Sequence, residues 1–159
     1  MPSAAHLEVR LAGPDDAPVI AALLHESFVE FKALYTDGGF AATALDARQI
    51  LVRMREGPVW VALRESRVIG TVAAVARDES VYIRGMAVLP AARGSGAGAR
   101  LLEQVENWAA SERHTRLFLS TTPFLSAAIH LYERSGFRRT DDGIRDLHGT
   151  PLFTMEKAL

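Results

Sequence analysis

The stretch that decides the fold is GMAVLPAARGSGAG, residues 85–98. Its first half completes a strand-like run from about Ser80 to Leu89, and Pro90 ends that run. Its second half is a glycine loop, after which apolar residues recur at helical spacing over residues 101–109. Residues 116–120 again have the composition of a strand. A strand, a helix and a second strand in succession predict a crossover connection and therefore a parallel strand pair.

The flanking segments predict further strands, mostly antiparallel. Residues 59–63 and 68–75 are apolar runs separated by Glu65-Ser66, which predicts a hairpin. Gly85, inside the third strand of this group, indicates a bulge or a close backbone approach. Shorter strands are expected at residues 7–11, 137–140 and 152–155. The sequence thus predicts an α/β fold with a mixed, mostly antiparallel sheet, one parallel junction and flanking helices, with ligand expected at the junction.

Two helices are predicted before the hairpin and one after the parallel pair. The first should run from the Pro14-Asp15-Asp16 turn to about Phe31, and the second should end at Gly57-Pro58. We interpret Asp37-Gly38-Gly39 as a break between them and Thr43 with Asp46 as a capping box. Four residues of the second helix are expected close to one side: Leu45, Gln49, Val52 and Met54. The last helix should cover residues 123–135 with Gly136 as its C-terminal cap, followed by a loop at residues 141–151.

The composition is that of one soluble globular domain. The chain has 159 residues, a formal net charge of -1 and no run of about 20 apolar residues, so nucleic acid and membrane are not expected partners. The N-terminus lacks a basic stretch followed by an apolar core, and we therefore expect a cytoplasmic protein. With no cysteine, acyl transfer through an acyl-cysteine is excluded. The five histidines have no metal-ligand spacing, so no metal is expected.

The glycine loop is typical of phosphate recognition. Unpaired N–H groups at a helix start favour an anion, glycines allow it to approach, and Arg93 adds a full positive charge. No Gly-Lys-Ser/Thr follows, which excludes a Walker A loop. Gly94, Gly96 and Ala99 satisfy a permissive dinucleotide fingerprint, but the next strand lacks the acidic residue that this motif expects. Taken alone, the loop could also be only a tight turn.

Two motifs together resemble the GNAT superfamily of N-acetyltransferases. Arg93, Gly96 and Gly98 match the family's Arg/Gln-x-x-Gly-x-Gly/Ala loop. Residues 131–137, LYERSGF, match its Leu-Tyr-x-x-x-Gly-Phe signature. The resemblance is close over about residues 81–138 and implies one GNAT domain over residues 1–159. It also implies that the two parallel strands splay apart to admit the pantetheine arm of acetyl-CoA.

The resemblance further implies which residues bind the donor. Backbone groups of Met86, Ala87 and Val88 would hold the pantetheine and polarise the thioester carbonyl. The pyrophosphate would lie on the loop residues Arg93, Gly94, Ser95, Gly96, Ala97 and Gly98. The family often has an asparagine at the position of Leu125, and Ser126 is the substitute we expect for that contact.

The expected reaction is direct acetyl transfer, in a ternary complex, from acetyl-CoA to an amine of a small molecule or a peptide. Tyr132 matches the family's usual proton donor to the departing thiolate. The main alternative is a non-catalytic acyl-CoA sensor or structural protein of the same fold, and a dinucleotide-binding redox domain is a third class. A homodimer is the expected form if the chain associates, because paired subunits are the commonest soluble oligomers.

The base that deprotonates the amine is not identified by the sequence. Some family members place a glutamate where this chain has Tyr82. Glu26 and Glu30 lie one helical turn apart and are candidates, although such pairs are usually solvated surface acids. Arg84 can meet a substrate carboxylate or be an edge charge. His148 is a candidate for shaping the acceptor site from the last loop.

Overall fold

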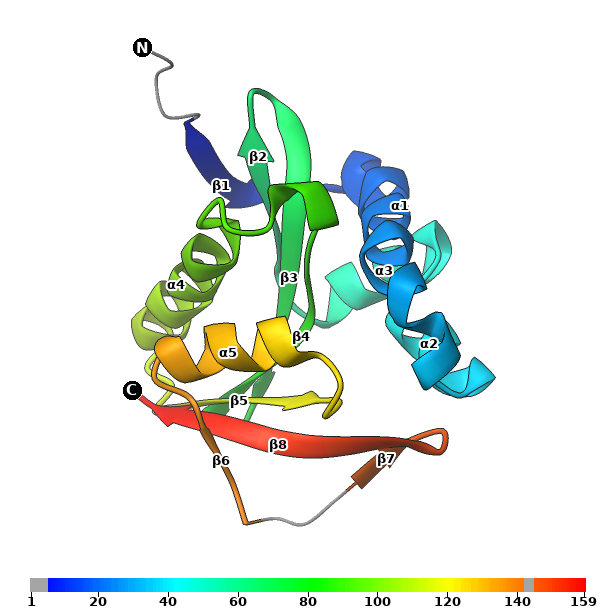
Figure 1. Ribbon diagram of the computed structural model, residues 1–159. Coiled ribbons are helices and arrows are strands. Elements are labelled where there is room, and N and C mark those ends of the chain that lie inside the picture. Colours follow the sequence, from blue (N-terminus) through cyan, green and yellow to red (C-terminus); the bar gives the residue numbers. More distant parts are fainter. Residues whose placement is uncertain (1–5, 142–144) are drawn as a thin grey trace.

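The computed structural model describes residues 6–141 and 145–159, and Figure 1 shows how the elements are arranged. The first five residues and residues 142–144 of the last loop lie outside the described residues. The α-helices are α1 Ala17–Phe28, α2 Asp37–Thr43, α3 Ala47–Glu56, α4 Ala97–Ser111 and α5 Ser126–Arg134. The strands are β1 Leu7–Leu11, β2 Val59–Arg64, β3 Arg67–Arg77, β4 Ser80–Val88, β5 Arg116–Thr121, β6 Arg138–Arg139, β7 Arg145–Leu147 and β8 Thr150–Ala158.

The strands form a mixed sheet whose order is β1-β2-β3-β4-β5-β8-β6, with β7 paired to β8. Among the described strands, β4 and β5 are the parallel pair and every other pairing is antiparallel. The hairpin between β2 and β3 turns at Glu65 and Ser66, which both have positive φ. That backbone suits the right-handed twist of the flanking strands. The predicted α/β fold with one parallel junction is confirmed.

The parallel pair separates after a short stretch of pairing. Residues 80–82 of β4 pair with residues 116–118 of β5, whereas β4 continues to Val88 and β5 to Thr121. Gly85 lies in β4 beyond the last pair, has a φ of +62° and falls where the register between β3 and β4 shifts. It is therefore at the bulge that the sequence predicted. From this point onward the β5-facing edge of β4 has no strand partner.

Three local predictions about the opening helices are corrected. The segment containing Asp37-Gly38-Gly39 begins helix α2, because the Thr36 side chain accepts the N–H of Gly39 as an N-cap. Thr43 does not cap the next helix. Asp46 does, exchanging hydrogen bonds with Gln49 in a capping box. Ile50 carries the buried side of α3, and Val52 is 50% exposed.

Element ends also differ from the predictions. Helix α1 ends at Phe28 and a 3₁₀ segment, Val29–Leu34, continues the chain. Helix α5 begins only at Ser126. The last loop contains β7, a three-residue strand that pairs with β8 and was not predicted. Strands this short leave little periodicity to detect.

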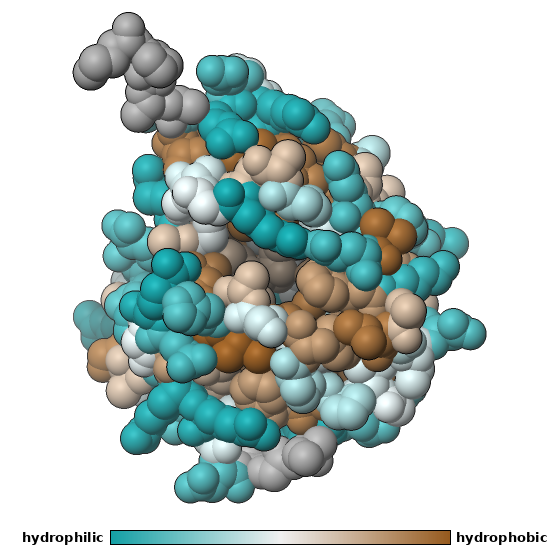
Figure 2. Space-filling view, in the orientation of Figure 1, coloured by the Kyte–Doolittle hydropathy of each residue, from teal (hydrophilic) through white to brown (hydrophobic). Residues whose placement is uncertain are grey.

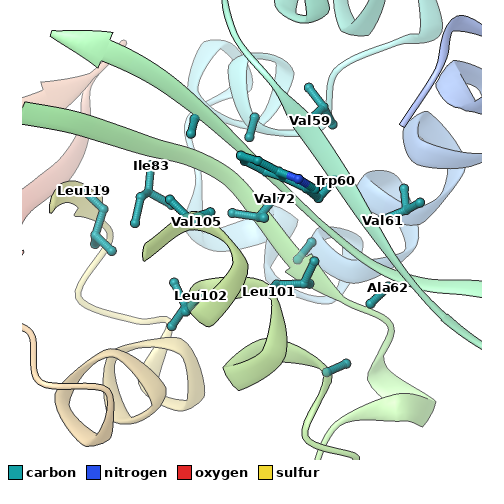
Figure 3. Packing of buried hydrophobic residues seen from close by; sticks show 14 of the residues in the cluster. Val59, Trp60, Val61, Ala62, Val72, Ile83, Leu101, Leu102, Val105 and Leu119 are labelled. Atoms are coloured by element: carbon teal, nitrogen blue, oxygen red, sulfur yellow. The ribbon is translucent and has the colours of Figure 1, made fainter. Parts of the chain in front are cut away.

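Helices cover both faces of the sheet. In Figure 1, α1 and α3 lie on one side and α4 on the other, with α5 drawn above β5 and β8. Figure 3 shows Leu101, Leu102 and Val105 of α4 facing Val72, Ile83 and Leu119 of three successive strands. Each is almost fully buried, and burying a side chain of this size contributes about 1.5–3 kcal/mol. The core therefore fixes α4, and with it the glycine loop, against the centre of the sheet.

Candidate functional site

The glycine loop has a backbone that only small residues accommodate well. Gly94 and Gly96 have φ of +81° and +88°, in the left-handed region that glycine favours. A Cβ at Gly94 would meet nothing within 4 Å, and one at Gly96 would meet only Leu7 at 3.8 Å, so both face open space. At Gly98, by contrast, a Cβ would lie 2.7 Å from Leu131 Cδ2 of α5. Gly98 thus lets α5 approach the start of α4.

The loop presents backbone donors at the N-terminus of α4. The first helical hydrogen bond is donated by Arg100 to Gly96, so the amides of Gly98 and Ala99 precede it. The Ala97 amide donates to Ser95 Oγ at 3.3 Å. Free amides at the positive end of a helix dipole form an anion site, and a phosphate group fits this description.

A cavity of about 530 Å³ opens beside these amides, and we call it the loop cavity. It is lined by the end of β4, the glycine loop, one side of α5 and residues near the end of α1. Figure 2 shows a hollow on this face with hydrophobic side chains around it. The sequence-predicted donor residues that line it are Met86, Ala87, Val88, Arg93, Gly94, Ser95, Gly96, Ala97 and Gly98. Ser126 does not line it, whereas its neighbour Leu125 does.

Arg93 ties the loop to the other side of this cavity. Its Nη2 lies 2.6 Å from Glu30 Oε1 and 3.5 Å from the Ser27 carbonyl oxygen. Both charged side chains are more than a third exposed, so the ion pair contributes little stability. The Arg93 guanidinium is therefore held at the cavity by a partner that an incoming anion can replace.

A second cavity, of about 230 Å³, lies between β4, β5, α3 and the strands β7 and β8. We call it the arginine cavity, because Arg53 of α3 and Arg84 of β4 line it. Its other walls include Tyr35 and Tyr82, the hydroxyl-bearing residues Ser120, Thr121 and Thr122, and the apolar residues Ile83, Leu119, Leu147 and Leu152. The splay between β4 and β5 thus opens into a chamber with polar and apolar walls.

The two cavities meet around Tyr132. Phe28, Met86, Leu125 and Tyr132 line both of them. Tyr132 is 6% exposed and packs beside Phe137, with ring centroids 6.0 Å apart. Burial raises the pKa of the Tyr132 phenol above its ordinary value, with a smaller contribution from Tyr35. The hydroxyl consequently keeps its proton at neutral pH and is available as a donor.

The arginine cavity carries an excess of positive charge. Arg84 Nη2 donates to Glu56 Oε1 at 3.0 Å, and Glu56 is about half exposed. Arg53 lies across Gly85, since a Cβ at that glycine would be 2.5 Å from Arg53 Nη1. Burial, followed by the charge of Arg84, lowers the pKa of Arg53 to about 10. Two guanidinium groups thus share this chamber with one acidic partner at its edge.

Glu26, Glu30 and His148 lie outside both cavities, whereas Tyr82 lines the arginine cavity. Glu26 and His148 are exposed and line neither cavity. Glu30 is engaged with Arg93, and Tyr82 stacks on Phe118 with ring centroids 5.1 Å apart. Arg53 was not predicted as a site residue, because an arginine near the end of a helix is usually solvated. Only the packing of α3 against β4 brings Arg53 to the same cavity as Arg84, and the sequence does not show that packing.

No group of three histidine, aspartate or glutamate side chains that could hold a metal ion occurs among residues 6–141 and 145–159. In the same residues, none of the helices has both the length and the apolar character needed to cross a membrane.

Comparison with known proteins places these features in context. Residues 20–137 match the sequence model described as the acetyltransferase (GNAT) family. The chain is 32% identical over 132 residues to the uncharacterized N-acetyltransferase YjgM of Escherichia coli, covering 79% of this chain and 78% of that protein. It is 38% identical over 85 residues to the N-acetylaspartate synthetase of Danio rerio, covering 52% of this chain but only 30% of the relative.

The fold has close structural counterparts. The PaiA N-acetyltransferase of Thermoplasma acidophilum, solved in complex with coenzyme A, superposes with a TM-score of 0.83 over 97% of this chain and 99% of that one. Sequence identity in this comparison is 16%, so the likeness concerns the fold.

Proposed function

Because the chain belongs to the acetyltransferase (GNAT) family, we propose that it transfers an acetyl group from acetyl-CoA directly to the primary amine of a small molecule or peptide. The observation that carries the proposal is the meeting of two cavities at Tyr132. One cavity has the features of a donor site and the other those of an acceptor site. Direct transfer between two substrates requires such a junction, because the reacting atoms must approach within about 3–3.5 Å.

The loop cavity fits the donor. Its glycine loop offers open space and backbone amides to a pyrophosphate, and Arg93 supplies a cation beside it. The β4 residues Met86, Ala87 and Val88 border the same cavity along the edge that β5 has left. Backbone groups on that edge are suited to hold the pantetheine amides and the thioester carbonyl. Ser126 has no place in this proposal, since it lies outside the cavity.

In the proposed reaction, the neutral amine attacks the thioester carbonyl and forms the new C–N bond. Strand amides near Val88 stabilise the negative charge that develops on the carbonyl oxygen. The C–S bond then breaks, and the Tyr132 hydroxyl donates its proton to the sulfur. The proton lost by the amine returns through solvent to the tyrosinate. Neither cavity has a cysteine among the described residues, so the transfer does not pass through an acyl-cysteine.

The proposed acceptor class is a primary amine of a small molecule or a peptide. Several relatives bear names that describe an acetylated amino acid as product, but this chain spans less than half of their length. We propose the cytoplasm as the location, since acetyl-CoA is an intracellular metabolite. A homodimer stays a prediction.

The test is calorimetric titration of the protein with acetyl-CoA, CoA and NADH, combined with thiol release from acetyl-CoA in the presence of mixed primary amines. We expect both CoA species to bind and NADH not to bind. Gly96→Val should abolish CoA binding by filling the space that the pyrophosphate needs. Gly149→Val is the matched control: its φ of +91° imposes similar strain, but it lines neither cavity.

The outcomes separate the alternatives. Binding of CoA with amine-dependent thiol release supports the enzyme. Binding without release with any amine favours an acyl-CoA sensor. A protein that ignores CoA and binds NADH contradicts the proposal altogether.

A further inference from the structure

The arginine cavity holds more positive charge than the protein itself balances. Of its lining residues, Arg53 and Arg84 carry full charges and none of the described ones is acidic. Glu56 neutralises Arg84 in part, from a half-exposed position at the edge. No ion pair joins Arg53 to any residue in the described part of the chain. Glu56 stabilises the charge of Arg53 only weakly, and an incompletely compensated cation in a partly buried chamber is costly unless an anion joins it.

Arg84 also has a buried donor without an acceptor. Its Nε atom is shielded from solvent and has no hydrogen-bond partner within the described residues. Its Nη2 atom is already bonded to Glu56. Buried polar groups are nearly always paired, so an orphaned donor on a residue that lines a cavity needs a partner, which a ligand in that cavity can supply. The planar guanidinium, with Nε and Nη side by side, matches the two oxygens of a carboxylate.

We propose that the acceptor is a small primary amine that also carries a carboxylate, with Arg84 and Arg53 binding that carboxylate in the arginine cavity. The proposal rests on the function proposed above and specifies its substrate class. The carboxylate oxygens accept from the Nε and Nη groups of Arg84 and compensate the charge of Arg53. The amine then extends toward Tyr132, where the two cavities meet.

The size of the chamber agrees with a small amino acid. A volume of about 230 Å³ is below the ~300–1,000 Å³ typical of pockets for larger ligands. The apolar residues Ile83, Leu119, Leu147 and Leu152 provide surface for the carbon skeleton, and the hydroxyl-bearing residues Ser120, Thr121 and Thr122 add weaker polar contacts.

The same arginines favour the reactive form of the amine. An alkylammonium has a pKa of about 10.4 in water and cannot attack while protonated. The titratable side chains facing the chamber are Arg53 of α3, Arg84 and Tyr82 of β4, Tyr35 beyond the 3₁₀ segment, and Tyr132 of α5, with Glu56 at the edge. Glu56 and the bound carboxylate offset the two guanidinium charges overall, but a guanidinium near the amine still disfavours a second cation there, so Arg53 lowers the pKa of the bound amine relative to the same site without it.

The experiment measures acceptor recognition separately from catalysis. The CoA-saturated protein is titrated calorimetrically with amino acids and with the matching amino-acid amides, and the same pairs are then assayed by thiol release from acetyl-CoA. We expect the amino acids to bind and to be acetylated. Their amides should bind much more weakly and react more slowly. Arg84→Gln should raise the KM for the carboxylates about 10- to 100-fold, the loss expected for a charge-assisted hydrogen bond, and leave the KM for acetyl-CoA unchanged. Arg84→Lys should recover part of this loss, since it restores the charge but not the planar fork.

Two measurements distinguish binding from folding. Arg55→Gln is the control, since Arg55 is an exposed arginine of the same helix as Arg53 and lines neither cavity. It should behave as the unmodified protein. The acidic limb of kcat against pH, measured at saturating acceptor, should move to higher pH in Arg53→Gln, because removing a cation raises the pKa of the bound amine.

Each result has a definite meaning. Acetylation of amides or simple alkylamines in preference to amino acids overturns the substrate class while leaving the acetyltransferase intact. Amino-acid binding that Arg84→Gln does not weaken overturns the role of the arginines. Amino acids that bind the CoA complex in an Arg84-dependent way without any turnover support the carboxylate site and contradict the enzyme.

Discussion

Arg93 and Glu30 form an ion pair, with Nη2 and Oε1 2.6 Å apart, that joins the glycine loop to the 3₁₀ segment after α1. The two residues approach the loop cavity from opposite sides, and Arg93 lines it. A pyrophosphate on the loop would compete with the Glu30 carboxylate for the same guanidinium. Glu30 therefore competes with the donor for Arg93.

Replacing Glu30 should strengthen donor binding. Glu30→Gln removes the competing charge, and we expect the affinity for CoA to rise about two- to fivefold, in keeping with the small energy of an exposed ion pair. Calorimetry at low ionic strength measures the change. Glu26→Gln, one turn earlier and outside both cavities, should have no effect. Weaker CoA binding by Glu30→Gln would mean that the pair organises the loop instead of competing with its ligand.

Asp46 should stabilise α3, the helix that carries Arg53. Its side chain accepts the Gln49 amide at 2.8 Å, and the Gln49 side chain accepts the Asp46 amide at 3.0 Å. Asp46→Ala leaves helix-end amides without an acceptor and should lower the free energy of unfolding by about 1 kcal/mol. Urea denaturation measures this, with Arg48→Ala, on the exposed side of the same turn, as the control. Equal unfolding midpoints for the two variants would contradict the cap.

The sequence predicted the elements whose patterns are long or chemically distinctive. The hairpin at Glu65-Ser66, the bulge at Gly85 and the crossover through the glycine loop all depend on local signals and are confirmed. Helix α2 was missed because its glycines favour a break, while the compensating contacts come from far along the chain. Thr36 bonds the His148 carbonyl oxygen and packs against Thr150. Such contacts have no local signature.

The candidate site divides in the same way. The loop residues are contiguous, and the backbone conformation of Gly94 and Gly96 follows from their lack of a Cβ. The arginine cavity combines α3, β4, β5 and the strands β7 and β8, so Arg53 and Arg84 come close together only when helix and strand are packed. Leu125 lines both cavities and Ser126 lines neither, and the sequence alone could not show which of the two neighbours faces the site, because that depends on where helix α5 begins.

Low pH should reduce the folding stability of the protein, in part by protonating Asp16. This carboxylate accepts from Arg10 Nη1 and Nη2 at 2.9 and 3.0 Å and from the Gly13 amide at 2.8 Å. These bonds, that from Arg10 foremost, hold the pKa of Asp16 below its ordinary value of 3.8. A depressed pKa contributes stability that is fully present above the ordinary value and is lost as pH falls through the folded-state value.

The difference in urea midpoint between the unmodified protein and Asp16→Asn measures this contribution. It should be constant near neutral pH and shrink below about pH 4, where the unfolded carboxyl also binds its proton. Asp15→Asn, the exposed neighbour, should show a much smaller difference. A difference for Asp16→Asn that grows as pH falls would contradict the sign.

Replacing Gly85 even by alanine should destabilise the protein. Its φ of +62° disfavours other residues by roughly 1–2 kcal/mol, and a Cβ would also displace Arg53, whose Nη1 lies 2.5 Å from that position. Gly85→Ala should therefore lower stability and raise the acceptor KM together, as thermal unfolding and steady-state kinetics would record. Gly13→Ala, where a Cβ meets nothing within 4 Å, should change neither quantity. An unchanged acceptor KM for Gly85→Ala would mean that the position of Arg53 does not affect acceptor binding.

Tyr132 should affect turnover more than binding. Removal of its hydroxyl in Tyr132→Phe keeps the buried ring against Phe137 but deprives the departing thiolate of its proton donor. General acid catalysis contributes roughly 10²–10⁴-fold to the rate, so we expect kcat to fall by at least about 100-fold. The Kd for acetyl-CoA should change little, by about twofold at most, because the proton is needed in catalysis and not in binding. Tyr35→Phe is the comparison, because Tyr35 is also buried but lines only the arginine cavity. It should retain most of the turnover. If Tyr132→Phe keeps its kcat at every pH, the proton reaches the sulfur by another route, and the junction of the two cavities positions the substrates without supplying an acid.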